Sequence, residues 1–104
     1  MIAFHYLFVT WKEERMSSSS KHRDFVGEPM GEKNVTSVPG IGTAYGAKLN
    51  NAGYDQASQL YGKFLVEAKN EDRFVGFMKE TANAKSNHAN NAYNGLNEWH
   101  TQNS

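Results

Sequence analysis

The sequence predicts an all-α domain of five helices, and three observations support this class. Apolar residues recur at helical spacing, no stretch alternates apolar and polar residues for long enough to form a strand, and glycine and proline separate the helical segments. A chain of 104 residues is one domain at most. Branched aliphatic residues are sparse, so the core is expected to be small and rich in aromatic side chains. A partner subunit would help to stabilise a domain of this size.

The first feature along the chain is an apolar run, Ile2–Trp11. No basic residue precedes this run and the charged residues Lys12–Arg15 follow it, which is not the pattern of a secretory signal. The simpler interpretation is that residues 1–15 are an extension outside the fold, or the product of a mis-set start codon. The domain is then expected to begin at Met16 and to cover residues 16–104.

Short segments and turns are expected next. A four-serine run, Ser17–Ser20, is typical of a flexible polar segment, and a basic-then-apolar piece follows at 21–26. Proline and glycine two residues apart in Glu28–Gly31 predict a turn. One proline and two glycines lie close together in Val38–Gly42, which predicts a sharper turn. Gly53 is placed to end the following helix as the residue just beyond its C-cap.

Three longer helices are expected in the rest of the chain. The first is capped by Asp55, the second by Asn70 and the third by Ser86, all short polar residues that can bind free helix amides. Glu71 and Asp72 lie in the first turn of the second helix, where the helix dipole favours negative charge. The apolar stripes are, in order, Ala57, Leu60, Tyr61, Phe64, Leu65 and Ala68; Phe74, Phe77 and Met78; and Ala89, Ala92, Tyr93, Leu96 with Trp99 or His100.

The most informative segment is Thr36–Leu49, which reads TSVPGIGTAYGAKL. It predicts a short helix that ends at the Pro-Gly turn and a second helix that starts after it. Gly42 or Thr43 can cap the second helix. This arrangement is the pattern of a helix-hairpin-helix motif at about residues 36–52.

The glycines of this motif suit a phosphate site. Gly40 and Gly42 lack a Cβ atom, so the backbone can turn sharply and approach a phosphate closely. The first amides of the following helix have no partner within the helix, and its dipole favours an anion there. Gly46 would let the two helices pack closely, and the ammonium group of Lys48 could reach a neighbouring phosphate.

Two other interpretations of the hairpin stay open at this point. It can be an ordinary tight turn between packed helices, or a motif that packs against protein instead of DNA. Eleven basic and eleven acidic residues cancel, so any nucleic-acid contact must be local. No apolar segment reaches the roughly 20 residues of a membrane span, and membrane insertion is not expected.

Catalysis and metal binding are not expected. A base-excision enzyme built on this motif needs a pocket for an extruded base, and the short chain leaves little room for one. The absence of cysteine excludes thiolate metal sites and cysteine nucleophiles. The four histidines, His5, His22, His88 and His100, lack the spacing of metal ligands. No catalytic residue, metal or cofactor is therefore predicted.

Several stretches of the chain resemble the barrier-to-autointegration factor family. They are KHRDFVGEPMGEK at 21–33, PGIGTAYGAKL at 39–49, AGYDQASQLYGKFLV at 52–66, NEDRF at 70–74 and NGLNEWH at 94–100. The similarity runs from about Ser17 to about Trp99 without an obvious gap. Residues 1–15 lie outside it.

The resemblance implies a compact five-helix protomer that forms a symmetric homodimer. The dimer would bind double-stranded DNA without sequence preference and bridge two DNA segments. Further implied partners are LEM-domain proteins of the inner nuclear membrane, lamins and histones. The implied roles are chromatin organisation and nuclear envelope assembly. The implied location is the nucleus, at chromatin and the nuclear envelope, and also the cytoplasm.

The resemblance also implies site residues. The DNA contacts that the family resemblance implies are Lys21, Gly40, Ile41, Gly42, Ala44, Tyr45, Lys48 and Ser86. In the hairpin the contacts are expected to be made by backbone amides. The dimer interface carried over is Gly62, Leu65 and Val66. Phosphorylation that releases DNA is implied at Ser17, Ser18 or Ser19.

The sequence departs from the family pattern at positions that matter for function. Lys48 and Lys69 stand alone where the family usually has adjacent lysine pairs, and Glu67 and Arg73 stand at usually apolar positions. The missing lysines and the formal net charge of zero favour an alternative function. In this alternative the chain is an adaptor of the same fold that binds LEM-domain proteins or a paralogue, with weak or no DNA binding.

Overall fold

The computed structural model describes residues 17–103, and its helices agree with the predicted class. In this range it contains five α-helices, one 3₁₀ turn and a single isolated β-bridge. The helices are α2 (Ser17–Gly27), α3 (Thr43–Asn51), α4 (Ala57–Val66), α5 (Glu71–Ala82) and α6 (Ser86–Asn103), and the 3₁₀ turn is η1 (Val35–Ser37). The all-α prediction is therefore confirmed. The expected extension at residues 1–15 and the expected start at Met16 lie outside the described residues.

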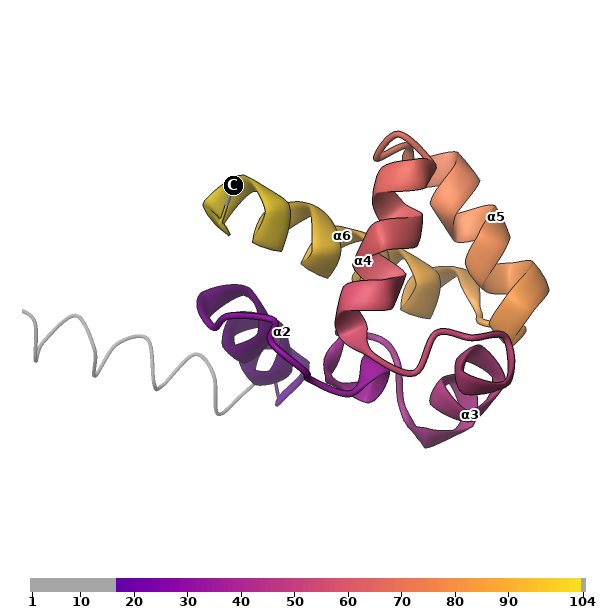
Figure 1. The fold of residues 1–104 in the computed structure, drawn as a ribbon, viewed down its shortest axis with the longest axis horizontal. Helices are drawn as coiled ribbons and strands as arrows, with labels where there is room; N and C mark the ends of the chain where they lie inside the picture. The colour runs from indigo at the N-terminus through magenta and orange to yellow at the C-terminus, as the bar shows by residue number, and fades with distance from the viewer. Residues whose placement is uncertain (1–16, 104) are drawn as a thin grey trace, which may run out of the picture.

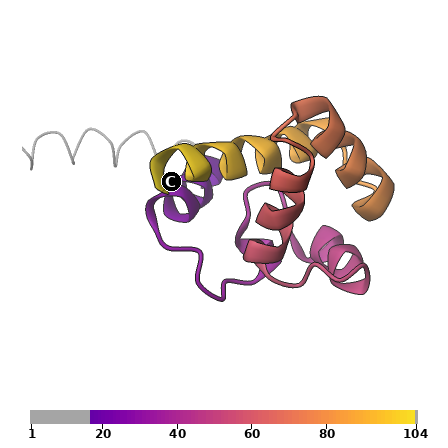
Figure 2. The ribbon, with the colours of Figure 1, turned by 45° about the horizontal axis from the view of Figure 1, so that its top comes forward.

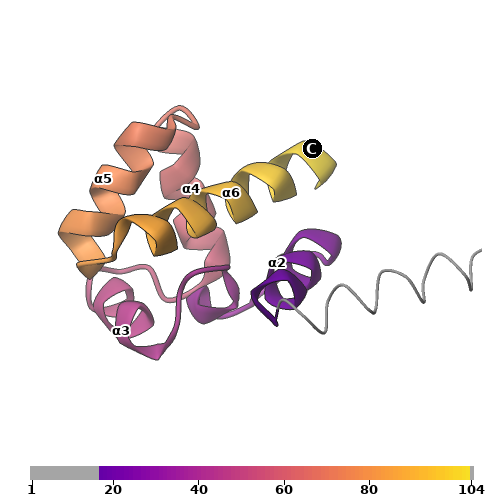
Figure 3. The same ribbon diagram turned by 180° about the vertical axis from the view of Figure 1, so that it is seen from behind.

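Helix α6 is the longest helix and lies across the middle of the domain (Figure 1). It packs against α5, α4 and α2. Its C-terminal half lies along α2, as Figure 2 shows, and there Trp99 Nε1 donates to the Glu28 carbonyl at 2.9 Å. The views from the front and from behind place α3 at one end of the domain and the α4–α5 connection at the opposite end (Figures 1 and 3). None of the described helices is both long and apolar enough to cross a lipid bilayer.

The core is small and built around aromatic rings, as the composition predicts. Phe64 and Phe74 are fully buried and meet edge to face, with ring centroids 6.1 Å apart. Burying one such side chain contributes about 1.5–3 kcal/mol to stability. The other large, fully buried side chains are Phe25, Val35, Val38, Ile41, Leu49, Leu60, Met78 and Leu96. The predicted stripes of α5 and α6 pack into or against this core, as does the α4 stripe except for Leu65, which is exposed, and Ala68.

Several predicted helix ends are confirmed. Asn70 caps α5, since its Oδ1 accepts from Arg73 N at 2.9 Å. Gly42 is the N-cap of α3, and Gly53 follows the C-cap of α3 with a φ of +98°. A left-handed φ at this position is what glycine allows without steric cost.

Other predicted ends are wrong for identifiable reasons. Asp55 does not cap α4. Gln56 is the cap, and Gln59 Oε1 accepts from the backbone N–H groups of both residues at 2.9 Å. Ser86 does not cap α6 either, because Ala89 N donates to the carbonyl of residue 85 and the helix has already begun. In each case the helix begins at a different residue from the one that the predicted cap implied.

Two further expectations need correction. Ser17–Ser20 forms the first turn of α2 and is not a separate flexible segment. Helix α4 ends at Val66, so Ala68 is not part of its stripe and adopts a φ of +59° in the following turn. The long helical stripe predicted from the sequence is thus cut short by a left-handed turn.

Candidate nucleic-acid interface

The hairpin turns sharply at Pro39 and Gly40. Ile41 N donates to the Val38 carbonyl at 3.1 Å, and Gly40 has a φ of +83°. Proline followed by a residue of positive φ is the signature of a type II turn. Val38 N donates in turn to the Val35 carbonyl at 3.1 Å. The first half of the motif is therefore the single 3₁₀ turn η1, shorter than the helix expected there.

Three glycines of the hairpin differ in what surrounds them. A Cβ on Gly40 would overlap the main-chain carbonyl oxygen of His88 in α6. A Cβ on Gly46 would lie 2.5 Å from Thr36 Cγ2, which confirms that this glycine lets α3 pack closely on η1. Beside Gly42 no heavy atom lies within 4 Å of the Cβ position. Gly40 and Gly46 therefore serve packing, whereas Gly42 borders open space.

The N-terminus of α3 presents free amides at this open space. The first bond of the helix runs from Gly46 N to the Gly42 carbonyl at 2.8 Å. The N–H groups of Thr43, Ala44 and Tyr45 consequently have no acceptor within the helix. Gly42 has no side chain to cover them. The partial positive charge of the helix end gathers here, and such a site accepts an anion.

The start of α6 lies beside the same site, and Tyr45 joins the two. Its hydroxyl oxygen accepts from Lys85 N at 3.2 Å and lies 2.9 Å from His88 Nδ1. The two rings meet edge on, with centroids 5.4 Å apart. The exposed Ser86 is the first residue of α6, and its amide is one of three without an acceptor inside that helix. Two helix N-termini therefore converge.

A shallow hollow of about 310 Å³ separates the two helix starts. It is lined by Gly40, Gly42, Thr43, Ala44, Tyr45 and His88. Most of these residues are among the predicted DNA contacts, so the structure brings that part of the set together. Thr43 and His88 were not predicted as contacts. The predicted contact in this helix was Ser86, and the pairing of His88 with Tyr45 could not be predicted because the two residues lie 43 positions apart.

Lys21 reaches the hairpin from α2. Its Nζ donates to the Ile41 carbonyl at 2.8 Å, and partial burial lowers the pKa of Lys21 below its ordinary value. An ammonium group has three N–H donors, so two stay available beside the loop. Ile41 is different, since its side chain is fully buried and both its N and O atoms are hydrogen-bonded inside the protein. Ile41 therefore holds the hairpin against the core and does not face a ligand.

Lys48 lies in the last turn of α3 and is exposed. It follows Tyr45 by three positions, and residues three apart lie on the same face of a helix. The structure thus places one exposed cation on the face of α3 that continues from the hollow. The neighbouring Ala47 adds no second charge.

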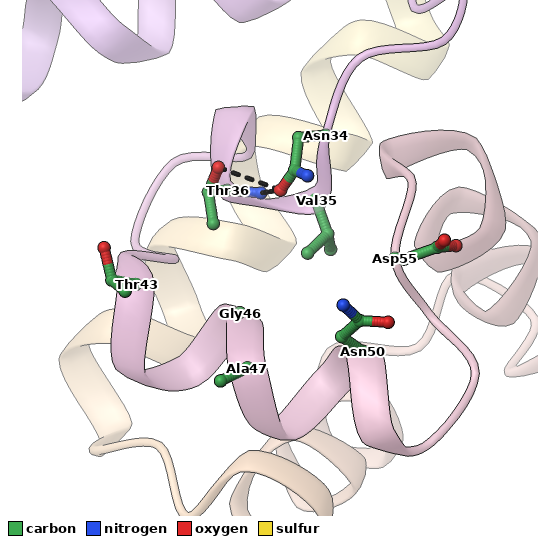
Figure 4. Close-up of a pocket in the computed structure, with 8 residues that line it drawn as sticks. All are labelled: Asn34, Val35, Thr36, Thr43, Gly46, Ala47, Asn50 and Asp55. Atoms are coloured by element: carbon green, nitrogen blue, oxygen red, sulfur yellow. Dashed lines mark hydrogen bonds between the residues drawn. The ribbon is translucent and has the colours of Figure 1, made fainter.

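A second hollow of about 340 Å³ lies beside α3, between η1 and the start of α4 (Figure 4). Asn34 Oδ1 accepts there from both N and Oγ1 of Thr36 at 3.0 Å, so this carbonyl caps η1. The charged residue in its lining is Asp55, which would repel a phosphate. This hollow is therefore not the anion site. Among residues 17–103, no group of three side chains is placed to hold a metal ion.

The residues carried over for the dimer interface form an exposed apolar patch on α4. Leu65 is 43% exposed and Val66 is 72% exposed, and no other large hydrophobic residue in the described range is classed as exposed. Gly62 lies nearly one turn earlier, with no heavy atom within 4 Å of its Cβ position. The patch has room for a partner surface at this glycine.

The charged departures from the family pattern lie next to this patch and neutralise each other. Glu67 accepts from Lys63 Nζ at 2.8 Å and from Arg73 Nε at 3.0 Å. The hydrogen bond from Lys63 lowers the pKa of Glu67, and the same bond raises the pKa of Lys63. Lys63 Nζ also lies 4.9 Å from the centre of the Phe77 ring. Glu67 and Arg73 thus form a paired network on the surface.

Comparison with known proteins gives one consistent family. A family model described as barrier to autointegration factor matches residues 16–103. Barrier-to-autointegration factor 1 of Caenorhabditis elegans is 55% identical over 87 residues, which cover 84% of this chain and 98% of that protein. The corresponding factor of Drosophila melanogaster is 48% identical over 79% of this chain and 91% of its own length. The human factor is 46% identical over 81% and 94%, respectively.

Proposed function

The chain belongs to the barrier-to-autointegration factor family of DNA-binding chromatin proteins, and from that premise we propose that it holds duplex DNA by the sugar-phosphate backbone at the hairpin hollow. The contacts proposed are the backbone amides of Gly42, Ala44 and Tyr45, the ammonium groups of Lys21 and Lys48, and the amide of Ser86. Gly40 and Ile41 shape the loop.

The observation that carries this proposal is the convergence of two helix N-termini on one hollow. Free amides of α3 and α6 border this hollow, and the ammonium group of Lys21 is bound to the Ile41 carbonyl in the same hairpin. No carboxylate lines the hollow among the described residues. A local positive site of this kind is compatible with a formal net charge of zero for the whole chain. Phosphates carry no base identity, so binding is expected to be independent of sequence.

Reversing the charge of Lys48 tests this site. We expect Lys48→Glu to weaken duplex binding about tenfold or more, because it replaces a phosphate-binding cation by an anion. The slope of log affinity against log salt should become less steep by about 0.9, the value for one phosphate contact. Fluorescence anisotropy at two salt concentrations, on two duplexes of unrelated sequence, measures both quantities.

Lys69→Glu is the matched control, since it makes the same charge change in the α4–α5 connection, at the opposite end of the domain from α3 (Figure 1). It should change affinity much less. Equal losses from the two variants, or a strong preference for one duplex, would exclude the hairpin as the DNA site. Melting curves by circular dichroism show whether both variants stay folded.

We further propose that the protein is a homodimer that bridges two DNA segments, with Gly62, Leu65 and Val66 at the interface. The exposure of the two aliphatic side chains supports this proposal. The alternative is an adaptor with weak or no DNA binding, which the single lysines at 48 and 69 favour. The family membership favours the DNA-binding function over the adaptor.

Phosphorylation at Ser17, Ser18 or Ser19 is proposed as the switch that releases DNA. These residues form the first turn of α2, just before Lys21. A phosphate adds about −1.5 to −2 charges at neutral pH and would repel the DNA backbone there. Glutamate at positions 18 and 19 should weaken duplex binding several-fold in an anisotropy titration. Unchanged affinity of both this variant and the phosphorylated protein would reject the switch.

The remaining assignments follow from the family. Membership implies nuclear and chromatin association. We propose that the nuclear partners are LEM-domain proteins, lamins and histones, and that the protein also acts at the nuclear envelope and occurs in the cytoplasm. Pull-down by a LEM domain tests the first partner class. We also propose that residues 1–15 lie outside the domain, as the family match begins at residue 16; an unchanged melting temperature after their removal would support this boundary.

A further inference from the structure

His88 lines the hairpin hollow and was not itself among the predicted DNA contacts, although Ser86 two residues earlier was. Its ring packs against Tyr45, and its own amide is one of the free N–H groups at the start of α6. We propose that His88 is a further DNA-binding residue, which donates a hydrogen bond from Nε2 to a phosphate in the hollow and strengthens DNA binding at mildly acidic pH. The inference rests on the proposed function, which places a DNA phosphate in this hollow.

The Tyr45 hydroxyl is the hydrogen-bond partner of His88 Nδ1. The Tyr45 hydroxyl oxygen accepts from Lys85 N–H at 3.2 Å, so its own proton is available for His88 Nδ1 at 2.9 Å. A neutral imidazole that accepts at Nδ1 carries its proton on Nε2. In this tautomer His88 has an N–H donor for a phosphate oxygen while the ring is uncharged.

The groups that surround His88 suit an anionic ligand. Tyr45 is the titratable side chain that faces it from α3, and Lys85 precedes it by three residues at the start of α6. Lys21 does not line the hollow, but its ammonium group binds the Ile41 carbonyl elsewhere in the hairpin. In the described part of the chain, no carboxylate borders the hollow. The phosphate would consequently be the negative partner of the ring.

Protonation of the ring preserves this arrangement and adds a charge. Imidazole changes charge between about pH 5 and 8. When Nδ1 gains a proton it becomes a donor, and the Tyr45 hydroxyl can rotate to accept from it, because its oxygen has two lone pairs. The Nε2 hydrogen bond to phosphate then becomes charge-assisted, which makes it roughly twice as strong. Duplex affinity therefore rises as pH falls through this range.

The test compares duplex affinity at about pH 6 and about pH 8, at constant ionic strength, for the full chain and two variants. His88→Gln keeps a neutral hydrogen-bond donor that does not titrate. His100→Gln is the matched control, since His100 Nδ1 lies 2.7 Å from the Tyr61 hydroxyl in an equivalent pair near the other end of α6. The full chain and His100→Gln should bind about fivefold more tightly at the lower pH, the effect of a typical exposed charge pair.

His88→Gln should lose most of this pH response while it still binds DNA at the higher pH. Tyr45→Phe, which removes only the hydroxyl that holds the ring, should reduce the response without any change of charge. A full pH response in both variants, or none in the full chain, overturns the proposal and leaves the proposed function intact. A full chain that binds no duplex at either pH overturns the proposed function, and the inference with it.

Discussion

Replacing Gly40 by alanine should lower the free energy of unfolding by about 3 kcal/mol. Two costs add. The φ of +83° is left-handed, which costs an L-residue with a Cβ about 1–2 kcal/mol. The new Cβ would also overlap the His88 carbonyl oxygen and lie 3.1 Å from Asn91 Cβ, so α6 must move. Overpacking of this kind costs about 1–3 kcal/mol.

The expected loss is large for a domain of this size. Total stability of such domains is about 5–15 kcal/mol, and each kcal/mol shifts the melting temperature by roughly 4–8 °C. Thermal unfolding followed by circular dichroism measures the change. At temperatures where Gly40→Ala is still folded, its duplex affinity should also be lower than that of the unaltered chain. The reason is that a shift of α6 separates the two helix N-termini that border the hollow.

Gly42→Ala is the matched control two residues away. Gly42 has a φ of −102°, and no heavy atom lies within 4 Å of its Cβ position. Its loss of stability should stay at or below about 1 kcal/mol, the difference between glycine and alanine at an N-cap. Its DNA affinity should still fall, because the methyl group occupies space that a phosphate would use. Equal melting temperatures for the two variants would contradict the packing role of Gly40.

The contrast between these glycines shows where sequence reasoning succeeds and where it stops. The spacing of apolar residues predicts α4, α5 and α6, and the Pro39-Gly40 pair predicts the turn. From the sequence alone, Gly40 and Gly42 support the same prediction, because both lack a Cβ atom. Only the structure separates them, because the packing partner of Gly40 is a carbonyl of α6 far along the chain.

Helix ends were predictable only where a single short side chain acts as the cap. Asn70 does so, and the prediction is confirmed. At α4 the cap is Gln56, and the long side chain of Gln59 reaches back to accept from the N–H groups of Asp55 and Gln56, which precede the helix. Asp55 looked like the better cap because propensity ranks short acidic residues above glutamine. The hydrogen bonds between neighbouring side chains and backbone decide which residue caps the helix, and capping propensity does not describe these bonds.

The candidate site was predictable in part. The hairpin residues were identified from their own spacing, since turn, free amides and Lys48 all lie within one short segment. Contributions from other helices were not. Lys21 and Ser86 came only from the resemblance to a family, and His88 came from neither source. Sites assembled from distant segments depend on tertiary packing, for which a single sequence carries no periodic signal.

The Leu65 and Val66 patch leads to the remaining prediction, which concerns self-association. Gly62→Glu should give a folded monomer that no longer bridges DNA. In the monomer the introduced carboxylate side chain has room, because no heavy atom lies within 4 Å of the Cβ position at Gly62. Removing a glycine from a helix interior even favours the helix by up to about 1 kcal/mol. In a symmetric dimer the same side chain would carry a charge into an apolar interface that contains both copies of the patch.

Gly76→Glu is the matched control for this change. Gly76 is also a half-buried glycine inside a helix with no atom within 4 Å of its Cβ position, and it lies on α5, outside the patch. Sedimentation should therefore report a dimer for the full chain and Gly76→Glu, and a monomer for Gly62→Glu. An immobilised duplex should capture a second, free duplex with the first two proteins only. Each Gly62→Glu monomer should still bind one duplex, because its hairpin lies away from α4's exposed end.

A monomeric full chain in light scattering would refute the dimer, and bridging by monomeric Gly62→Glu would show that one protomer holds two duplexes by itself.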